Sequence, residues 1–283
     1  MRNVLLLLEY DGTRYAGWQR QKDCITIQGV LEAALTTILN HPVSVHSSGR
    51  TDAGVHALGQ VATFTTERSL DCATLQRALS ALLPRDIRVI RVTEVPLDFH
   101  PRKSARKKQY VYAFWCGPCP VFLKAYVYPV LQKVNWDLVR EGAKLFVGYH
   151  DFTSFSSPSP CSPVRTVFSL DVCVRDDALV LLWIEASGFL HHMVRIMFGE
   201  LLLLGMGKRS LDELETMLRH PSYTAYRRFS LPSQGLYLVR VDYDGIDPYE
   251  GLELKDIGFI VPVWTKKNAQ KAPSLVDNSQ PLC

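Results

Sequence analysis

The sequence lacks any hydrophobic run long enough to cross a membrane. The apolar runs Val4 to Leu8 and Leu201 to Leu204 are far shorter than the about 20 residues that a transmembrane helix needs. No signal-peptide cleavage pattern follows the first run. We therefore interpret the first run as a buried strand and the second as part of a helix, and we expect a cytoplasmic protein.

A disulfide framework is also missing. The seven cysteines are scattered over 283 residues, a length that does not require disulfide bonds for stability. The one Cys-x-x-Cys, from Cys116 to Cys119, has no second pair or histidine cluster at zinc spacing. We expect reduced thiols and no structural zinc site.

The charge shows little excess of either sign. The formal net charge is only +4, and 47% of residues are hydrophobic against 21% charged. Such a composition is typical of a globular protein and excludes a largely disordered chain. Because the net charge is so small, only the local placement of charges can indicate a nucleic-acid partner.

Hydrophobic periodicity divides the chain into two halves. The first predicts helices 27–39 and 73–83 with strands 4–10, 43–47, 61–65 and 87–95. A basic segment with two prolines, 96–108, follows. The second half predicts helices 137–146, 190–204 and 211–219 with strands 110–115, 164–175, 179–187 and 236–243.

This mixture favours an α+β fold with helices packed on one face of largely antiparallel sheets. We assign residues 1–100 to the first half and 101–245 to the second. Residues 246–283 are predicted to form a loosely ordered tail, because prolines interrupt any periodicity there.

The segment GRTDAGVHA, from Gly49 to Ala57, is the strongest candidate for chemistry. Its glycines permit tight curvature and close approach of a ligand near Asp52. Spacing alone favours a simple turn in which Arg50 balances the charge of the aspartate. The exact order of residues in this segment favours a functional loop instead.

That string is the signature of TruA-type pseudouridine synthases, and five further blocks resemble the same family in the same order. They are EYDGT with GWQRQ in 9–21, FHPR with SAR in 99–106, DFTSF at 151–155, FLHHMVR at 189–195 and GLYLV at 235–239. The chain is therefore identified as a member of this family from about residue 4 to 243.

The resemblance implies that Asp52 is the catalytic aspartate and acts on a uridine flipped out of a tRNA. The reaction breaks the N1–C1′ bond, rotates the base and rejoins it through carbon 5. Asp52 would act as a nucleophile or as a base that removes the 2′ proton, and both routes need an ionised carboxylate. Arg195 resembles the family's basic partner of this aspartate, and Arg50 is a second cation that would keep it ionised.

Two further residues resemble the family's base-binding groups. Tyr110 corresponds to the tyrosine that stacks on the target uracil, since an aromatic face replaces the stacking that a flipped base loses. Leu236 resembles an apolar residue of the base pocket, although an ordinary core leucine explains it nearly as well. Tyr112 is expected in the core.

Basic residues near these motifs indicate an RNA-binding surface. The run 102–108 holds five positive charges in seven residues and directly precedes Tyr110. A solvated loop is the default interpretation of such a run, but beside an active-site tyrosine it favours phosphate contacts. The predicted contacts are Arg20, Arg102, Arg106, Lys107 and Lys108.

No metal or cofactor is predicted. His191 and His192 are adjacent, and neighbouring side chains on a helix point about 100° apart, so the pair should not converge on one ion. His56 and His100 are interpreted as structural or RNA-facing. The Ser- and Pro-rich stretch 154–162 is expected to lie away from the active-site blocks.

The resemblance also implies two ferredoxin-like, RRM-like halves whose sheets join, with Asp52 in a basic cleft between them. It implies a homodimer and, as substrate, the anticodon arm of tRNA at positions thirty-eight to forty. Two alternatives are an inert RNA-binding module and a nucleoside hydrolase. The intact set of Arg50, Asp52, Tyr110 and Arg195 argues against the first, and the absence of an acidic cluster argues against the second.

Overall fold

The structure is a computed structural model that describes residues 1–175 and 178–252. The first half contains β1 (Arg2–Tyr10), α1 (Ile27–Leu39), β2 (His46–Ser47), β3 (His56–Thr66), α2 (Cys72–Leu82) and β4 (Ile87–Val95). The second half begins with β5 (Ala105–Cys116), η1 (Val121–Leu123), β6 (Tyr128–Val130), α3 (Trp136–Leu145), β7 (Gly148–Asp151) and η2 (Thr153–Phe155). It continues with β8 (Val164–Arg175), β9 (Leu179–Ala186), α4 (Met193–Gly205), α5 (Leu211–Arg219) and β10 (Leu236–Tyr243).

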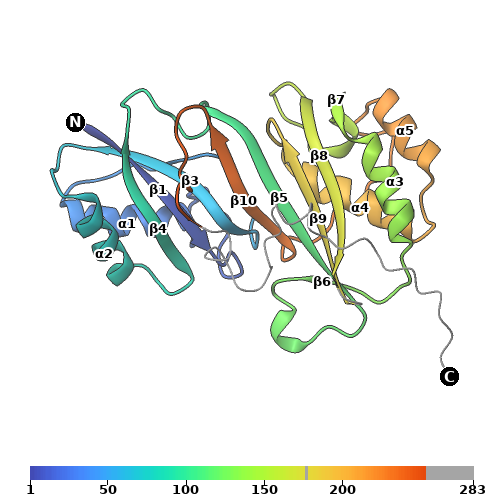
Figure 1. The fold of residues 1–283 in the computed structure, drawn as a ribbon, viewed down its shortest axis with the longest axis horizontal. Helices are drawn as coiled ribbons and strands as arrows, with labels where there is room; N and C mark the ends of the chain where they lie inside the picture. Colours follow the sequence, from blue (N-terminus) through green and yellow to red (C-terminus); the bar gives the residue numbers. More distant parts are fainter. Residues whose placement is uncertain (176–177, 253–283) are drawn as a thin grey trace.

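The strands of the described residues form one mixed sheet in the order β4-β1-β3-β10-β5-β9-β8-β7, with β2 paired to β3 and β6 to β5 (Figure 1). β10 comes last in the sequence but lies in the middle of the sheet. It pairs antiparallel with β5 and parallel with β3, where Tyr237 faces His56 and Leu238 faces Ala57. The two halves therefore share one continuous sheet, and they join through the parallel pair of β3 and β10.

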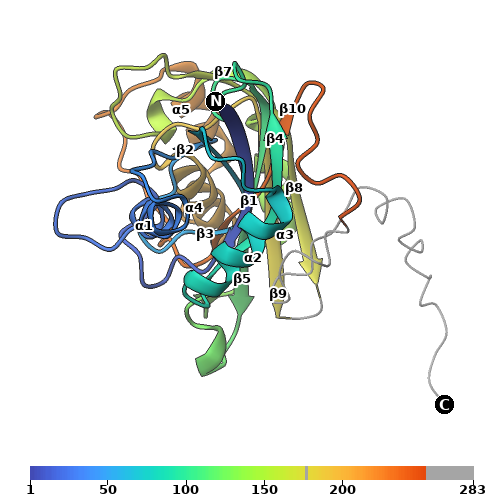
Figure 2. The same cartoon turned by 90° about the vertical axis from the view of Figure 1, so that its left-hand side faces the viewer.

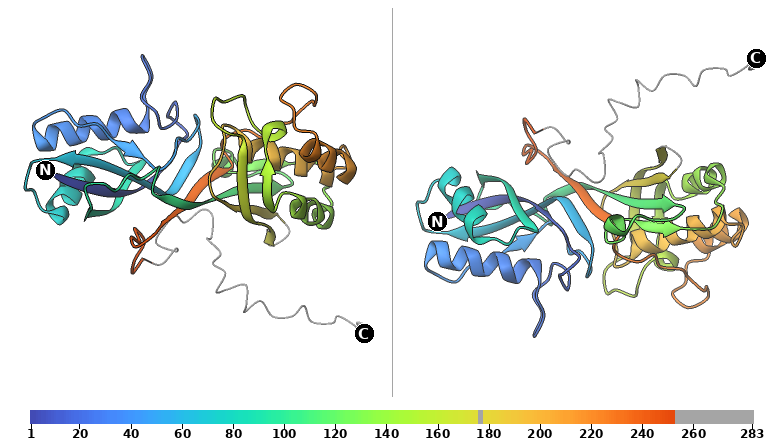
Figure 3. Two further views of the ribbon diagram at one scale, coloured as in Figure 1. Left: turned by 90° about the horizontal axis from the view of Figure 1, so that it is seen from above. Right: turned by 90° about the horizontal axis from the view of Figure 1, so that it is seen from below.

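Burial explains the patterns seen in the sequence. Val4 to Leu8 are all fully buried, because β1 lies between β3 and β4. Helix α1 starts where the Thr26 side chain accepts a hydrogen bond from Gly29 N, and it ends at Asn40, which adopts the left-handed conformation. α1 and α4 lie on the same side of the sheet (Figures 2 and 3), while α2 packs against β4 and α3 against β8 and α4.

Element boundaries follow the predictions closely where the hydrophobic pattern is strong. The predicted bounds of α1, α5, β4, β8 and β10 are confirmed. The predicted helix 190–204 is wrong at its start, because α4 begins at Met193. His192 before it has φ 62°, a left-handed conformation that an α-helix does not contain.

The end of the described chain packs onto the sheet. The Tyr249 hydroxyl donates a hydrogen bond to Gly59 O (2.7 Å) and accepts one from Val241 N (2.9 Å). Tyr249 falls within the predicted tail, but residues 253–283 of that tail lie outside the described residues. Over the described ranges, no helix has the length and apolar character needed to cross a bilayer.

Candidate active site

Asp52 lies on the loop between β2 and β3, and the loop that follows β1 holds it in place. Thr51 O accepts a hydrogen bond from Trp18 N (3.0 Å), and Gly54 N donates to Tyr15 O (3.3 Å). The Thr51 hydroxyl also bonds the Tyr10 hydroxyl (2.8 Å). Two of the sequence blocks thus form one unit that fixes the backbone on either side of the aspartate.

Two glycines allow the close approach of these loops. Gly17 has φ +85°, and a Cβ there would lie 2.6 Å from Thr51 O. Gly54 has φ +77°, and a Cβ there would lie 2.6 Å from the Ser233 hydroxyl. A side chain at Gly17 would meet backbone strain and a collision with backbone atoms, whereas one at Gly54 would meet backbone strain and the Ser233 side chain, which would have to move.

Arg195 approaches Asp52 from the first turn of α4, 143 positions later in the chain. Its Nη1 donates to Asp52 Oδ2 at 2.9 Å, and its Nε donates to Leu231 O at 2.6 Å. The second bond holds the guanidinium in place, so that its charge faces the carboxylate. Charge-assisted bonds of this kind are stronger than bonds between neutral groups.

His191 and His192 also face Asp52, contrary to the prediction that they diverge. His191 Nε2 lies 3.6 Å from Asp52 Oδ1, and His192 Nε2 lies 3.4 Å from Asp52 Oδ2. The two rings stack with their centroids 3.7 Å apart. The predicted divergence of about 100° applies inside a helix, whereas these residues precede α4.

These three side chains offer ligand atoms that lie within 4.8 Å of one another, and two imidazoles with a carboxylate are ligand types that suit zinc. A cation there would stand beside Arg195, which already occupies Asp52 Oδ2. A bound cation and the Arg195 guanidinium would carry like charges and would repel each other. That the reaction uses no metal stays a prediction.

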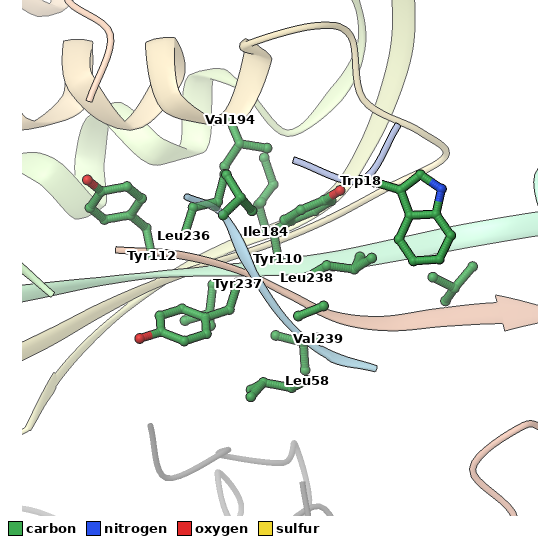
Figure 4. Packing of buried hydrophobic residues seen from close by; sticks show 14 of the residues in the cluster. Trp18, Leu58, Tyr110, Tyr112, Ile184, Val194, Leu236, Tyr237, Leu238 and Val239 are labelled. Atoms are coloured by element: carbon green, nitrogen blue, oxygen red, sulfur yellow. The ribbon is translucent and has the colours of Figure 1, made fainter. Parts of the chain in front are cut away.

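Tyr110 and Leu236 border the same site from β5 and β10. Tyr110 contacts the edge of Phe189, with ring centroids 5.0 Å apart. Figure 4 shows Tyr110, Leu236 and Val194 in one cluster. Burial, assisted by the nearby charge of Asp52, raises the pKa of the Tyr110 phenol well above its usual value, so it stays neutral. Tyr112 is fully buried and its hydroxyl donates to Pro232 O, which confirms its predicted place in the core.

A cleft of about 940 Å³ opens above these residues. Its lining includes Asp52, Tyr110, His192, Arg195, Arg102 and Arg165. Residues 158–161 also line it, so the expectation that the Ser- and Pro-rich stretch lies away from the active site is wrong. This stretch has no periodic pattern, so nothing in its sequence indicates that it borders the cleft.

Lys108 forms a hydrogen bond to the loop that carries Asp52. It shares one face of β5 with Tyr110, and its Nζ donates to Ser48 O at 2.6 Å. Burial lowers the pKa of Lys108 to about 8, and the charges of Arg102 and Arg165 add to that shift. Lys108 and Arg102 both line the cleft.

Three of the remaining predicted cations, Arg20, Arg106 and Lys107, do not line the cleft. Arg20 pairs with Glu32 at 3.1 Å and Arg106 with Asp244 at 2.6 Å. Lys107 is on the opposite face of β5 from Lys108 and pairs with Glu185 at 3.1 Å. Arg50 is exposed and lines the cleft, but in the described part of the chain it forms no ion pair with Asp52.

His56, the last polar residue of the signature, is buried and structural. Its ring stacks on Tyr237 at 4.7 Å, and its Nδ1 lies 3.2 Å from Asp11 Oδ1. Hydrogen bonds from His56, Thr13 and Tyr126 outweigh the effect of burial and lower the pKa of Asp11. This network ties the start of β3 to the turn after β1.

Comparisons with known proteins show the family of the chain. A model of the family described as tRNA pseudouridine synthase matches residues 7–102 and 143–244. The chain is 39% identical over 246 residues to the tRNA pseudouridine synthase A of Citrifermentans bemidjiense, covering 86% of this chain and 98% of that protein. It is 41% identical over 253 residues to the one of Geotalea uraniireducens, covering 86% and 100%.

The chain belongs to the tRNA pseudouridine synthase A family. It is a tRNA pseudouridine synthase, an isomerase. This assignment replaces the inert RNA-binding module and the nucleoside hydrolase. Among solved structures, a Cbf5-Nop10-Gar1 complex resembles the synthase with a TM-score of 0.31 and 15% identity, covering 85% of this chain and 58% of that one, a likeness too weak to carry an argument.

Proposed function

We propose that this synthase isomerises uridines of the anticodon arm of tRNA, at positions thirty-eight to forty, with Asp52 as the catalytic carboxylate. The observation that carries the proposal is the Asp52–Arg195 pair at 2.9 Å, in a cleft that Tyr110 also lines. The choice of substrate positions rests on the resemblance to the TruA family.

The arrangement suits a uridine flipped into the cleft. Tyr110 and Leu236 offer an aromatic ring and an apolar side chain for the base. The ionised Asp52 would then act on the sugar or base, either as a nucleophile or as the base that removes the 2′ proton. Arg102 and Lys108 are placed to attract the phosphates, whose recognition is largely independent of sequence. No step requires a metal or a cofactor.

The test is the Asp52→Asn variant, which keeps the shape of the side chain and removes its charge. We expect it to abolish pseudouridine formation in tRNA while leaving tRNA binding close to that of the wild type. Mapping of pseudouridines after incubation with each protein measures both the activity and the positions used. Asp98→Asn, an exposed aspartate outside the cleft, is the matched control.

An Asp52→Asn protein that modifies tRNA at the normal rate would contradict the role of Asp52. Pseudouridines found only outside the anticodon arm would contradict the proposed substrate positions. The two results are independent, so each part of the proposal is tested separately.

We also propose a homodimer in which one tRNA spans both subunits, a state that the resemblance to the TruA family supports. Sedimentation of the protein with and without tRNA measures it. A monomer at working concentration, alone and with tRNA, would contradict this part of the proposal.

A further inference from the structure

The isomerisation needs a proton acceptor in addition to the group that acts on the sugar. When carbon 5 has bonded to C1′, its hydrogen must leave as a proton, whereas N1 has lost the sugar and must gain one. A side chain in the cleft that takes the first proton and supplies the second would complete the reaction without any co-reactant.

Two residues of the site are poorly suited to that task. Burial raises the pKa of Tyr110, so its phenol stays protonated and does not act as a phenolate base. Asp52 Oδ2 already accepts the Arg195 hydrogen bond, and the proposed function assigns this carboxylate to the sugar or base. The imidazole of His192 is the nearest alternative, because it lines the cleft beside Asp52.

Several contacts hold the His192 ring in one orientation. Its Nδ1 lies 2.9 Å from the Ser157 hydroxyl, and Ser157 N donates to the carbonyl oxygen of His191. The residue also has φ 62° and precedes α4 without capping it through its side chain. A non-glycine residue kept in this conformation is a recurrent feature of functional sites.

One tautomer of the His192 ring leaves Nε2 available as a proton acceptor. Nε2 lies 3.4 Å from Asp52 Oδ2, longer than an ordinary N–H···O bond. With the proton on Nδ1 donated to Ser157, Nε2 presents its lone pair to the cleft. The charged or titratable groups facing the ring are Asp52, His191 and Arg195, and burial lowers the pKa of His192 despite the opposing effect of Asp52, so the ring is neutral near pH 7.

We propose that His192 Nε2 accepts the C5 proton of the rejoined uracil and returns it to N1. The C5–H bond breaks and leaves its electron pair in the ring, the imidazolium forms beside the Asp52 carboxylate, and the N1–H bond then forms. His192 ends the cycle neutral, so atoms and charge balance. This inference rests on the proposed function, because it needs the uridine to lie against Asp52.

The experiment follows the C5 hydrogen. tRNA is transcribed with 5-deuterouridine triphosphate in place of the ordinary nucleotide, and single-turnover rates are measured on deuterated and undeuterated tRNA with excess enzyme. Mass spectrometry of the product detects the loss of deuterium at each pseudouridine. The variants are His192→Ala and His192→Gln, and the control is His191→Ala, which removes the neighbouring, more exposed imidazole.

We expect His192→Ala and His192→Gln to slow the reaction by roughly 100-fold or more, the usual loss when a general base is removed. Deuterated tRNA should react more slowly still in these variants, because loss of the C5 hydrogen has become rate-limiting. Wild type and His191→Ala should not distinguish the two tRNAs. Added imidazole should restore part of the rate to His192→Ala.

A merely structural role for His192 predicts a different result. The His192 variants would then be slow on both tRNAs to the same extent, or would bind tRNA weakly, and imidazole would not help; either outcome overturns the inference. An isotope effect that appears equally in His191→Ala also overturns it. If Asp52→Asn is inactive while His192→Ala is as fast as wild type, the proposed function stands and this inference alone fails.

Discussion

Lys108 shows how one partly buried cation connects the cleft to the catalytic loop. Its Nζ donates to Ser48 O, four positions before Asp52, and its surroundings lower its pKa to about 8 from 10.5. Below that pKa the folded protein holds the charge at a cost, because burial removes it from water.

That shift predicts a specific pH dependence. Between pH 8 and 10.5 the unfolded chain binds more protons at Lys108 than the folded protein does, so the contribution of Lys108 to stability rises with pH. Lys108→Met should lack this rise. Urea unfolding of both proteins across this range measures it, and a difference in unfolding free energy that does not change with pH would contradict the prediction.

The structure brings four of the predicted site residues, Asp52, Tyr110, Leu236 and Arg195, to one cleft, and their roles stay predictions. Arg20, Arg106 and Lys107 are not among the residues that line it. Their charges are used in ion pairs with acidic residues from distant parts of the chain. No local pattern reveals such partners.

Two loop glycines, Gly54 and Gly207, share a left-handed backbone but differ in their surroundings. Gly54 and Gly207 both have positive φ, +77° and +70°. They differ in surroundings: a Cβ at Gly54 would collide with Ser233, whereas a Cβ at Gly207 would meet nothing within 4 Å.

This pair predicts two different outcomes. Gly207→Ala should cost only the backbone strain, about 1–2 kcal/mol of stability, with normal activity. Gly54→Ala should cost more and should also reduce activity, because Ser233 or the catalytic loop must move. Thermal unfolding and single-turnover rates measure both effects. Equal losses in stability and activity for the two variants would show that strain alone matters.

Strong periodicity explains why α1, α5, β4, β8 and β10 were predicted correctly. The predicted start of α4 was wrong because His192 leaves the helical conformation, and helical periodicity does not reveal a single left-handed residue. The same departure is what turns both imidazoles toward Asp52.

At the scale of the molecule, β10 and the segment after it join the two halves. Tyr249 is buried and bonds Gly59 O on β3 and Val241 N on β10. The residues that the family model matches end at 244, before this contact.

Two truncated chains test the contribution of this segment separately from that of the residues after it. A chain ending at Leu252 keeps Tyr249, and we expect normal stability and activity. A chain ending at Gly245 loses Tyr249, and we expect a cost of about 3–5 kcal/mol, as for removal of other buried aromatic side chains. Urea unfolding and tRNA modification measure both. Equal stability of the two truncated chains would contradict the role given to Tyr249.

The sequence by itself determined the family, the α+β class and the identity of the central aspartate, because ordered motifs and hydrophobic periodicity are written in short stretches of chain. Only the tertiary structure decided that the sheet is continuous, that Arg195 and two histidines meet Asp52, and that residues 158–161 line the cleft. The reason is physical: these contacts join residues more than 100 positions apart, and their geometry depends on how β10 pairs with β3 and β5.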